Sequence, residues 1–166
     1  MRFALGCCVA CTSTTPAPAT TPSEALLVLP DVIVTATNAK VTVRSATHGG
    51  VELEAPGPPP SPLRRLEDRG TLVIRHAGQT CEAGVEVEAS VAACGDIVIS
   101  YQQGLVTMFS RDPLHTIGTA TVTEGDGACG TRAVSQTVRI RDTMIEFTGY
   151  RTVRCIGGGP PAPLIF

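Results

Sequence analysis

The chain has 166 residues, about the length of one domain, and its 17 glycines and 13 prolines make it rich in turns. Hydrophobic residues reach 43% and charged residues only 17%, so the chain can bury a core and is not expected to be disordered throughout. A net charge of -2 excludes the basic footprint of nucleic-acid binding, and no run of 18 apolar residues could form an ordinary membrane span. Two tyrosines, four phenylalanines and no tryptophan argue against an antibody-type sandwich built around a core tryptophan.

The first 24 residues have the layout of an export signal followed by a tether. Met1-Arg2 supplies a positive charge, residues 3–11 are an apolar stretch, and residues 12–22 are a Thr/Pro/Ala run that cannot pack. A small-residue cleavage site follows at Ala17-Pro18-Ala19. This order predicts export, with residues 1–24 outside the folded domain.

The signal could instead end at a lipid-modified cysteine, because the apolar stretch contains three cysteines. Ala4-Leu5-Gly6-Cys7 and Cys8-Val9-Ala10-Cys11 partly match an aliphatic residue, two small residues and a cysteine, and so this part resembles the lipoprotein signal. The resemblance implies a lipid on Cys11 or Cys7, with Cys8 as a further candidate. Cys8 and Cys11 also have the spacing of a redox or zinc pair, but no second pair of ligands and no strand-then-helix context accompanies them. An unstructured head on a cytosolic protein is the remaining alternative.

The rest of the chain is dominated by strand signals, because its 17 valines and 21 threonines fit a pleated surface better than a helix. Residues 85–91 show the cleanest period-2 alternation, and residues 97–101 are apolar on both sides, as is typical of a central strand. The prolines of residues 56–62 predict a linker or long loop, and residues 63–69 predict one or two helical turns. The expected strands are 26–29, 32–37, 41–45, 51–54, 71–76, 85–91, 97–101, 105–109, 117–123, 133–140, 144–148 and 152–155.

Short strands at this spacing predict an all-β fold, and we expect an antiparallel β-sandwich of the immunoglobulin-like or a related type. A small β-barrel is the alternative. The sandwich would be a single domain over residues 25–156, followed by a Gly/Pro-rich tail over residues 157–166.

Four cysteines lie in the predicted domain, and an even number in an exported chain suggests two disulfides. If the last two long strands form a hairpin turning at Asp142, Cys129 and Cys155 lie opposite each other. The remaining pair, Cys81 with Cys94, is awkward, because a straight strand over residues 85–91 spans roughly 20 Å, and both flanking segments must curl back to bring the sulfurs together. Gly149-Tyr150 could also interrupt the long hairpin. Four free thiols in a reducing compartment are the alternative.

Candidate chemistry is only weakly signalled. His48, His76 and His115 could form a metal site across neighbouring strands, although no two of them are spaced as ligands on one strand. Ser110, Asp112 and His115 are the residue types of an acyl-transfer triad, but adjacency along one loop is not triad geometry. A turn is the favoured interpretation of that loop.

Acidic residues give two further motifs. Glu52 with Glu54 and Glu86 with Glu88 alternate outward on strands, where a glycosidase pair is conceivable. A solvated face whose carboxylates pair with basic residues such as Arg139 and Arg141 is the stronger interpretation. Residues 124–127 match a fragment of a calcium loop, but the other ligands are missing and a turn is favoured.

The sequence therefore favours an exported protein, periplasmic, anchored in the outer membrane or extracellular, with a binding or structural role at the cell envelope. The contacts with a binding partner would come from strand-end loops at residues 48–50 and 110–116. We expect no cofactor, a protein or glycan partner, no nucleic acid, and a membrane only through the lipid anchor. The alternatives are a secreted hydrolase or metal-dependent enzyme built on the three histidines, and a cytosolic adaptor with free thiols.

Overall fold

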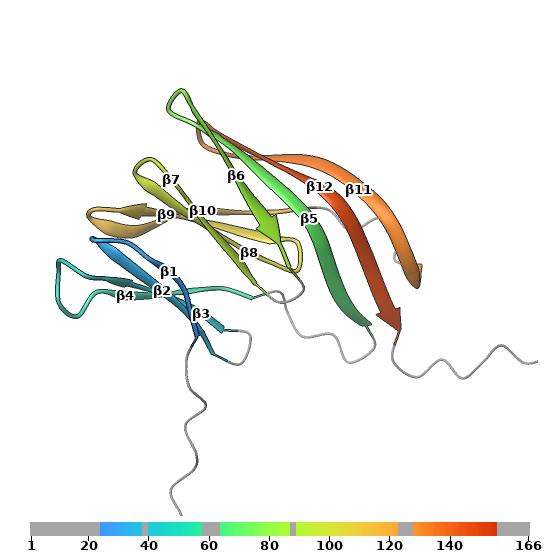
Figure 1. Ribbon diagram of the computed structural model, residues 1–166, viewed down its shortest axis with the longest axis horizontal. Helices are drawn as coiled ribbons and strands as arrows, with labels where there is room; N and C mark the ends of the chain where they lie inside the picture. The colour runs from blue at the N-terminus through green and yellow to red at the C-terminus, as the bar shows by residue number, and fades with distance from the viewer. Residues whose placement is uncertain (1–23, 38–39, 58–63, 87–88, 123–127, 156–166) are drawn as a thin grey trace, which may run out of the picture.

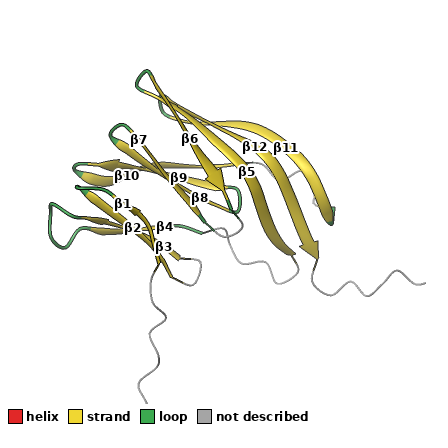
Figure 2. Ribbon diagram, viewed as in Figure 1, coloured by secondary structure: helices red, strands yellow, loops and turns green. Residues whose placement is uncertain are grey.

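The computed structural model describes residues 24–37, 40–57, 64–86, 89–122 and 128–155, and every regular element within these ranges is a β-strand (Figure 1, Figure 2). All the paired strands run antiparallel. The all-β prediction is confirmed. The strands are β1 (Glu24–Val28), β2 (Val32–Thr37), β3 (Lys40–Ser45), β4 (Glu52–Ala55), β5 (Arg64–His76), β6 (Gln79–Val85), β7 (Ser90–Cys94), β8 (Ile97–Gln102), β9 (Leu105–Arg111), β10 (Leu114–Thr121), β11 (Gly130–Ile140) and β12 (Thr143–Cys155).

These strands form three four-stranded sheets stacked as layers (Figure 1). The N-terminal sheet has the order β1-β2-β3-β4, the central sheet β10-β9-β8-β7, and the C-terminal sheet β11-β12-β5-β6. The central sheet lies between the other two, so the molecule is a β-sandwich with a third layer. No closed barrel forms among the strands of the described ranges.

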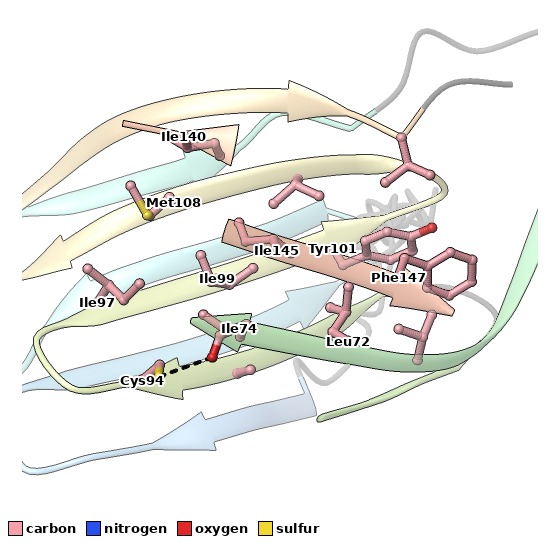
Figure 3. Close-up of a cluster of buried hydrophobic side chains, with 14 residues drawn as sticks. Leu72, Ile74, Cys94, Ile97, Ile99, Tyr101, Met108, Ile140, Ile145 and Phe147 are labelled. Carbon is pink, nitrogen blue, oxygen red and sulfur yellow. Dashed lines mark hydrogen bonds between the residues drawn. The ribbon is translucent and has the colours of Figure 1, made fainter. Parts of the chain in front are cut away.

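The central sheet is apolar on both faces because both faces are covered. Every residue of β8 is buried. Ile97, Ile99 and Tyr101 pack against Leu72 and Phe147 of the C-terminal sheet (Figure 3). On the opposite face, Val98 and Phe109 pack in a second cluster with valines of the N-terminal sheet, namely Val32, Val34, Val41 and Val43. The prediction of a central strand at residues 97–101 is thus confirmed, and two separate cores depend on it.

Turns from all three sheets gather at one end of the molecule, which we call the loop end (Figure 1). The hairpins β1–β2, β3–β4, β5–β6, β7–β8, β9–β10 and β11–β12 all turn there. Glu24 and Cys155, the first and last described residues, lie at the opposite end. The described part of the chain therefore begins and ends at one end, where the β8–β9 hairpin also turns, and it presents six other hairpins at the loop end.

The predicted helical turns at residues 63–69 are wrong where the structure describes them, from residue 64 onward. These residues begin β5, which pairs with β12 along its whole length. The charges that suggested a helix alternate across the strand instead: Arg65 and Arg69 point outward, and Asp68 points inward and is buried. Pairing with a distant strand overrides the local pattern here.

The single strand predicted over residues 85–91 is also wrong. Strand β6 ends at Val85 in the C-terminal sheet and β7 begins at Ser90 in the central sheet. The backbone N–H of Glu86 donates to the Ser90 hydroxyl at 3.0 Å across this crossing. The alternation continued on both sides of the crossing, so it did not reveal that the chain changes sheets.

That crossing removes the geometric difficulty with Cys81 and Cys94. The two cysteines lie at disulfide distance, with their Cα atoms 5.7 Å apart, and they connect edge strand β6 to edge strand β7. Cys129 and Cys155 are also at disulfide distance, with Cα atoms 5.8 Å apart at the open end of the β11–β12 hairpin. That hairpin pairs Gly130 with Val153, one residue away from the expected register.

The hairpin is continuous through Gly149, because another glycine faces it. Gly149 pairs with Gly70 of β5. A Cβ on Gly70 would lie 2.2 Å from the Thr148 carbonyl oxygen, and one on Gly149 would lie 2.1 Å from the Arg69 carbonyl oxygen. Any side chain at either position would collide with backbone, so this close approach of β5 and β12 requires two glycines.

We therefore expect Gly70→Ala and Gly149→Ala each to lower the free energy of unfolding by about 2–4 kcal/mol, because the two backbones must separate. Gly84→Ala on β6 is the matched control, since a Cβ there meets nothing within 4 Å. Chemical denaturation under non-reducing conditions measures all three. Equal stability of Gly149→Ala and Gly84→Ala would contradict the close pairing.

Candidate functional site

The loop end brings together all three histidines, each from a different hairpin. His48 lies in the β3–β4 loop, His76 is the last residue of β5, and His115 is the second residue of β10. The predicted contact loop at residues 110–116 is a tight hairpin: Ser110 belongs to β9, and only Asp112 and Pro113 lie between β9 and β10. It lies near the other predicted contact loop, since Asp112 is 3.7 Å from His48.

His76 connects the C-terminal sheet to the central sheet. Its Nε2 donates to Asp96 at 2.6 Å, and its Nδ1 is hydrogen-bonded to the Thr143 hydroxyl at 2.7 Å. The hydrogen bond from His76 holds the pKa of Asp96 below its ordinary value. Both ring nitrogens are therefore engaged, and His76 acts as a clamp between two layers.

Arg111 makes the equivalent connection between the central and N-terminal sheets. Its Nε and Nη2 donate to both carboxylate oxygens of Asp31, at 2.5–3.2 Å, and its Nη1 donates to the Gly95 carbonyl oxygen at 2.7 Å. The hydrogen bonds from Arg111 lower the pKa of Asp31. Two charge-assisted contacts thus tie the three layers together at the loop end.

The histidines share one end of the molecule but do not converge on a metal site. His48 Nδ1 is 3.0 Å from the Thr47 hydroxyl, and His115 Nδ1 is 2.9 Å from the Pro113 carbonyl oxygen. Within the described ranges, no three His, Cys, Asp or Glu side chains are arranged to hold a metal ion. The geometry therefore gives no support to the alternative of a metal-dependent enzyme built on these histidines.

The triad and carboxylate motifs also lack catalytic geometry. Ser110 and His115 are neighbours in the β9–β10 ladder, but the His115 Nδ1 contact is with the backbone rather than with Asp112. Glu54 is paired with Lys40 at 2.6 Å, and Glu52 lies opposite Arg44 on the exposed face of the N-terminal sheet. Glu86 is exposed; Glu88, the calcium-like residues 124–127 and the lipidation candidates Cys7, Cys8 and Cys11 lie outside the described residues.

A cleft of about 340 Å³ opens at the loop end, on the outer side of the C-terminal sheet. Its walls are the β5–β6 and β11–β12 turns, and Arg75, Arg139 and Met144 line it. Arg75 Nη1 donates to Glu146 at 3.1 Å, whereas the Nη2 of Arg139 contacts the Met144 sulfur at 3.2 Å. We call this hollow the arginine cleft. Its lining has two exposed guanidinium groups and one carboxylate, that of Asp142, so its net positive charge suits a ligand that carries a negative charge.

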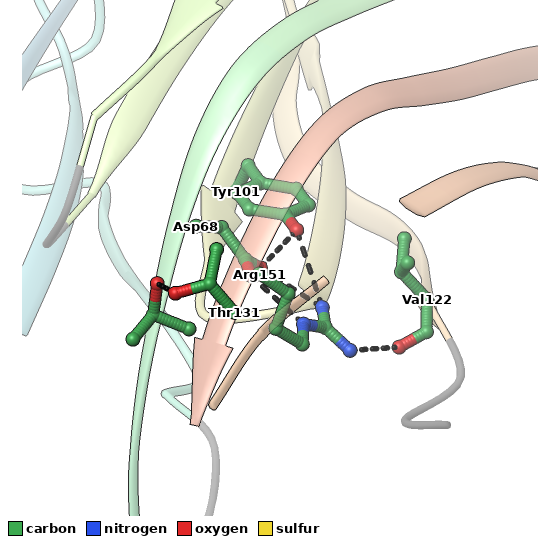
Figure 4. Close-up of polar contacts among 6 residues, drawn as sticks. Asp68, Tyr101, Val122, Thr131 and Arg151 are labelled. Carbon is green, nitrogen blue, oxygen red and sulfur yellow. Dashed lines mark hydrogen bonds and ion pairs between the residues drawn. The ribbon is translucent and has the colours of Figure 1, made fainter. Parts of the chain in front are cut away.

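A buried charge cluster, missed by the sequence analysis, lies between the central and C-terminal sheets (Figure 4). Arg151 and Asp68 are only 0% and 1% exposed and form a bidentate pair, with Nε–Oδ1 and Nη2–Oδ2 distances of 2.8 and 2.9 Å. The Tyr101 hydroxyl donates to the same carboxylate, and Arg151 Nη1 lies 3.5 Å from the Val122 carbonyl oxygen. No solvent reaches this pair, whose members are ladder partners on β5 and β12, and the Tyr101 hydroxyl connects the pair to the central sheet.

The electrostatics of the cluster match this arrangement. Burial, together with the adjacent Asp68 carboxylate, raises the pKa of Tyr101 above its ordinary value, and hydrogen bonding to Asp68 raises that of Arg151. Tyr101 therefore stays neutral and Arg151 charged at every physiological pH. The sequence does contain one signal of the cluster. Asp68 and Arg151 are each four residues away from an inward residue, Leu72 and Phe147 respectively, so strand alternation places them on the same inward face.

We expect Arg151→Met to lower the free energy of unfolding by about 3–5 kcal/mol, because it leaves the Asp68 carboxylate buried without its counter-charge. The double variant Asp68→Leu/Arg151→Met should recover most of that loss, since it removes both charges. Arg154→Met is the control, on the same strand but exposed, and should change stability by at most about 0.5 kcal/mol. Denaturation curves would contradict the buried pair if Arg151→Met behaved like Arg154→Met.

The clamps at the loop end predict a loss of stability in acid. Because the pKa values of Asp31 and Asp96 are lowered in the folded state, their contribution is complete above the ordinary value of 3.8 and is lost as the pH falls through the folded-state values. The melting temperature should fall between pH 5 and pH 2, and Asp31→Asn should flatten that fall. Asp142→Asn, at an exposed turn, serves as the control. A steeper or unchanged acid profile for Asp31→Asn would contradict the Arg111 clamp.

No helix that could cross a membrane occurs in the part of the chain that the structure describes. Comparison with known proteins finds no family model, no curated protein and no solved structure that matches the chain.

Proposed function

We propose that the protein is an exported β-sandwich with a binding role at the cell envelope, attached through its N-terminal segment and presenting the loop end to its partner. The observation that carries the proposal is the separation of the two ends. Glu24 and Cys155 lie at one end of the stacked sheets, and the six hairpin turns of the loop end lie at the other, together with the arginine cleft (Figure 1). A tether that joins the chain at Glu24 would leave the loop end directed away from its anchor.

The cysteines support an oxidising compartment. All four cysteines of the described ranges fall into two pairs at disulfide distance, and such bonds persist in exported proteins rather than in the cytosol. The alternative hypothesis of a cytosolic adaptor requires four free thiols instead of two cysteine pairs.

Attachment through a lipid is the finer part of the proposal. The chain before Glu24 contains Cys7 and Cys11 at the end of an apolar stretch, followed by a Thr/Pro run of tether composition. Of the two, Cys11 is the better lipid acceptor, because the whole apolar stretch precedes it and the tether follows directly.

The test is to express the full chain in a bacterial host supplied with labelled palmitate. We expect label in the protein and recovery in the membrane fraction. Cys11→Ser should abolish both, whereas Cys7→Ser, the matched control, should leave both unchanged.

The mass of the purified protein completes the test. Reduction should add four hydrogens, two for each cysteine pair. A chain that stays in the cytosolic fraction and gains no hydrogens on reduction would contradict export and favour the adaptor.

A further inference from the structure

The outer face of the C-terminal sheet differs in character from the rest of the surface. Strand alternation places one set of side chains in the core and the other set outward, and no other described element packs on that outward side (Figure 1). Its described side chains include five exposed arginines against three glutamates, Glu67, Glu82 and Glu146, in a chain of net charge -2. The arginines are Arg65, Arg69, Arg75, Arg139 and Arg154.

Two of these arginines have no carboxylate partner among the described residues. Glu67 pairs with Arg154 at 2.9 Å and lies 3.9 Å from Arg65, and Glu146 pairs with Arg75 at 3.1 Å. Arg69 forms no ion pair within the described ranges, and Arg139 contacts only the Met144 sulfur there. Among the described side chains of this face, Arg69, Arg139 and Glu82 are therefore left without an ion pair, and the face keeps a net positive charge.

An exposed tyrosine stands beside one of these two arginines. Tyr150 is 61% exposed and is the ladder neighbour of Arg69 on one side and of Ala133 on the other. Its neighbours along β12 on the same face, Thr148 and Thr152, are short. The ring thus rises above small, hydroxyl-bearing side chains and offers a flat apolar surface next to a guanidinium group.

The two arginines belong to an elongated pattern. Arg69 and Arg75 are six residues apart on β5, roughly 20 Å along the strand, and Arg75 lines the arginine cleft with Arg139. The pattern runs from Tyr150 and Arg69 to the cleft at the loop end, and two ladder pairs lie between them. The first is Thr71 with Thr148, and the second is Val73 with Glu146, whose carboxylate is neutralised by Arg75. A ligand that fits it is long, negatively charged and rich in hydroxyl groups.

We propose that this face binds an acidic polysaccharide whose negative charges are carboxylates. The C–H face of one sugar ring packs on Tyr150, its carboxylate pairs with Arg69, and a carboxylate further along the polymer pairs with Arg139 at the cleft. Threonine hydroxyls exchange hydrogen bonds with sugar hydroxyls between these points. The inference rests on the binding role proposed above and not on export or lipid attachment.

Nucleic acid fits this face less well. The chain is acidic overall, and the face carries a single aromatic ring where a single strand needs a series of stacking platforms. An acidic polypeptide would satisfy the arginines, but it makes little use of an exposed ring among hydroxyl groups.

The experiment is calorimetric titration of the oxidised, purified chain with polygalacturonate at low salt. We expect binding that weakens about tenfold in Arg69→Gln and about tenfold in Tyr150→Ala, and no binding of neutral dextran. Arg44→Gln is the matched control, because Arg44 is also exposed but lies on the outer face of the N-terminal sheet. Its affinity should equal that of the parent chain, and all variants should share the parent's melting temperature.

Three results would overturn the inference. They are no binding of polygalacturonate, an equal loss of affinity in Arg44→Gln and Arg69→Gln, or binding of polyglutamate as strong as that of polygalacturonate. The last would indicate an acidic polypeptide as the partner. A lipid-labelled, membrane-associated chain that fails to bind the polysaccharide would overturn this inference alone and leave the proposal of export in place.

Discussion

The burial of the central sheet on both faces is the constraint on which the rest of the structure depends. A sheet that meets water on one side can alternate apolar and polar residues, but a sheet between two others cannot. This explains why β8 has no exposed residue and why Val98 and Ile99, adjacent in sequence, belong to different cores. It also explains how a chain with few aromatic residues can form two cores, since aliphatic side chains on one strand contribute to both.

Polar contacts fix the alignment of the stacked sheets, which apolar packing alone does not determine. Apolar packing alone allows stacked sheets to slide, whereas the bidentate contact of Arg111 with Asp31 and the bridge from His76 to Asp96 require one alignment at the loop end. Inside the core, the Arg151–Asp68 pair imposes a second requirement on the β5–β12 register, and the Tyr101 hydroxyl connects this pair to the central sheet. A buried pair of this kind is a weak source of stability but a strict condition on register.

Much of the fold follows from residue patterns, and the exceptions have physical causes. Alternation located most strands and the two-sided strand β8, because side-chain direction in a strand is a local property. The start of β5 was misjudged because Asp68, a charged residue in an inward position, breaks the pattern of a half-buried strand. The close approach at Gly70 and Gly149 depends on two positions far apart in the chain, so neither glycine carries a local sign of it. The polar sites could not be predicted for the same reason. Each residue is recognisable in the sequence as polar or aromatic, but Arg69 and Tyr150 become neighbours only through the β5–β12 register.

The distribution of the cysteine pairs has a mechanical consequence. One pair joins the C-terminal sheet to the central sheet and the other closes the β11–β12 hairpin, whereas no cysteine lies in β1 to β4. Among the described residues, the N-terminal sheet is therefore held without a disulfide, by side-chain packing and by polar contacts such as Arg111 with Asp31 and Gln102 with the Ala55 carbonyl oxygen. Force transmitted through an N-terminal attachment reaches this sheet first, at Glu24. With the attachment proposed above, a pulling force should peel this sheet away as a separate layer while the other two sheets remain covalently joined.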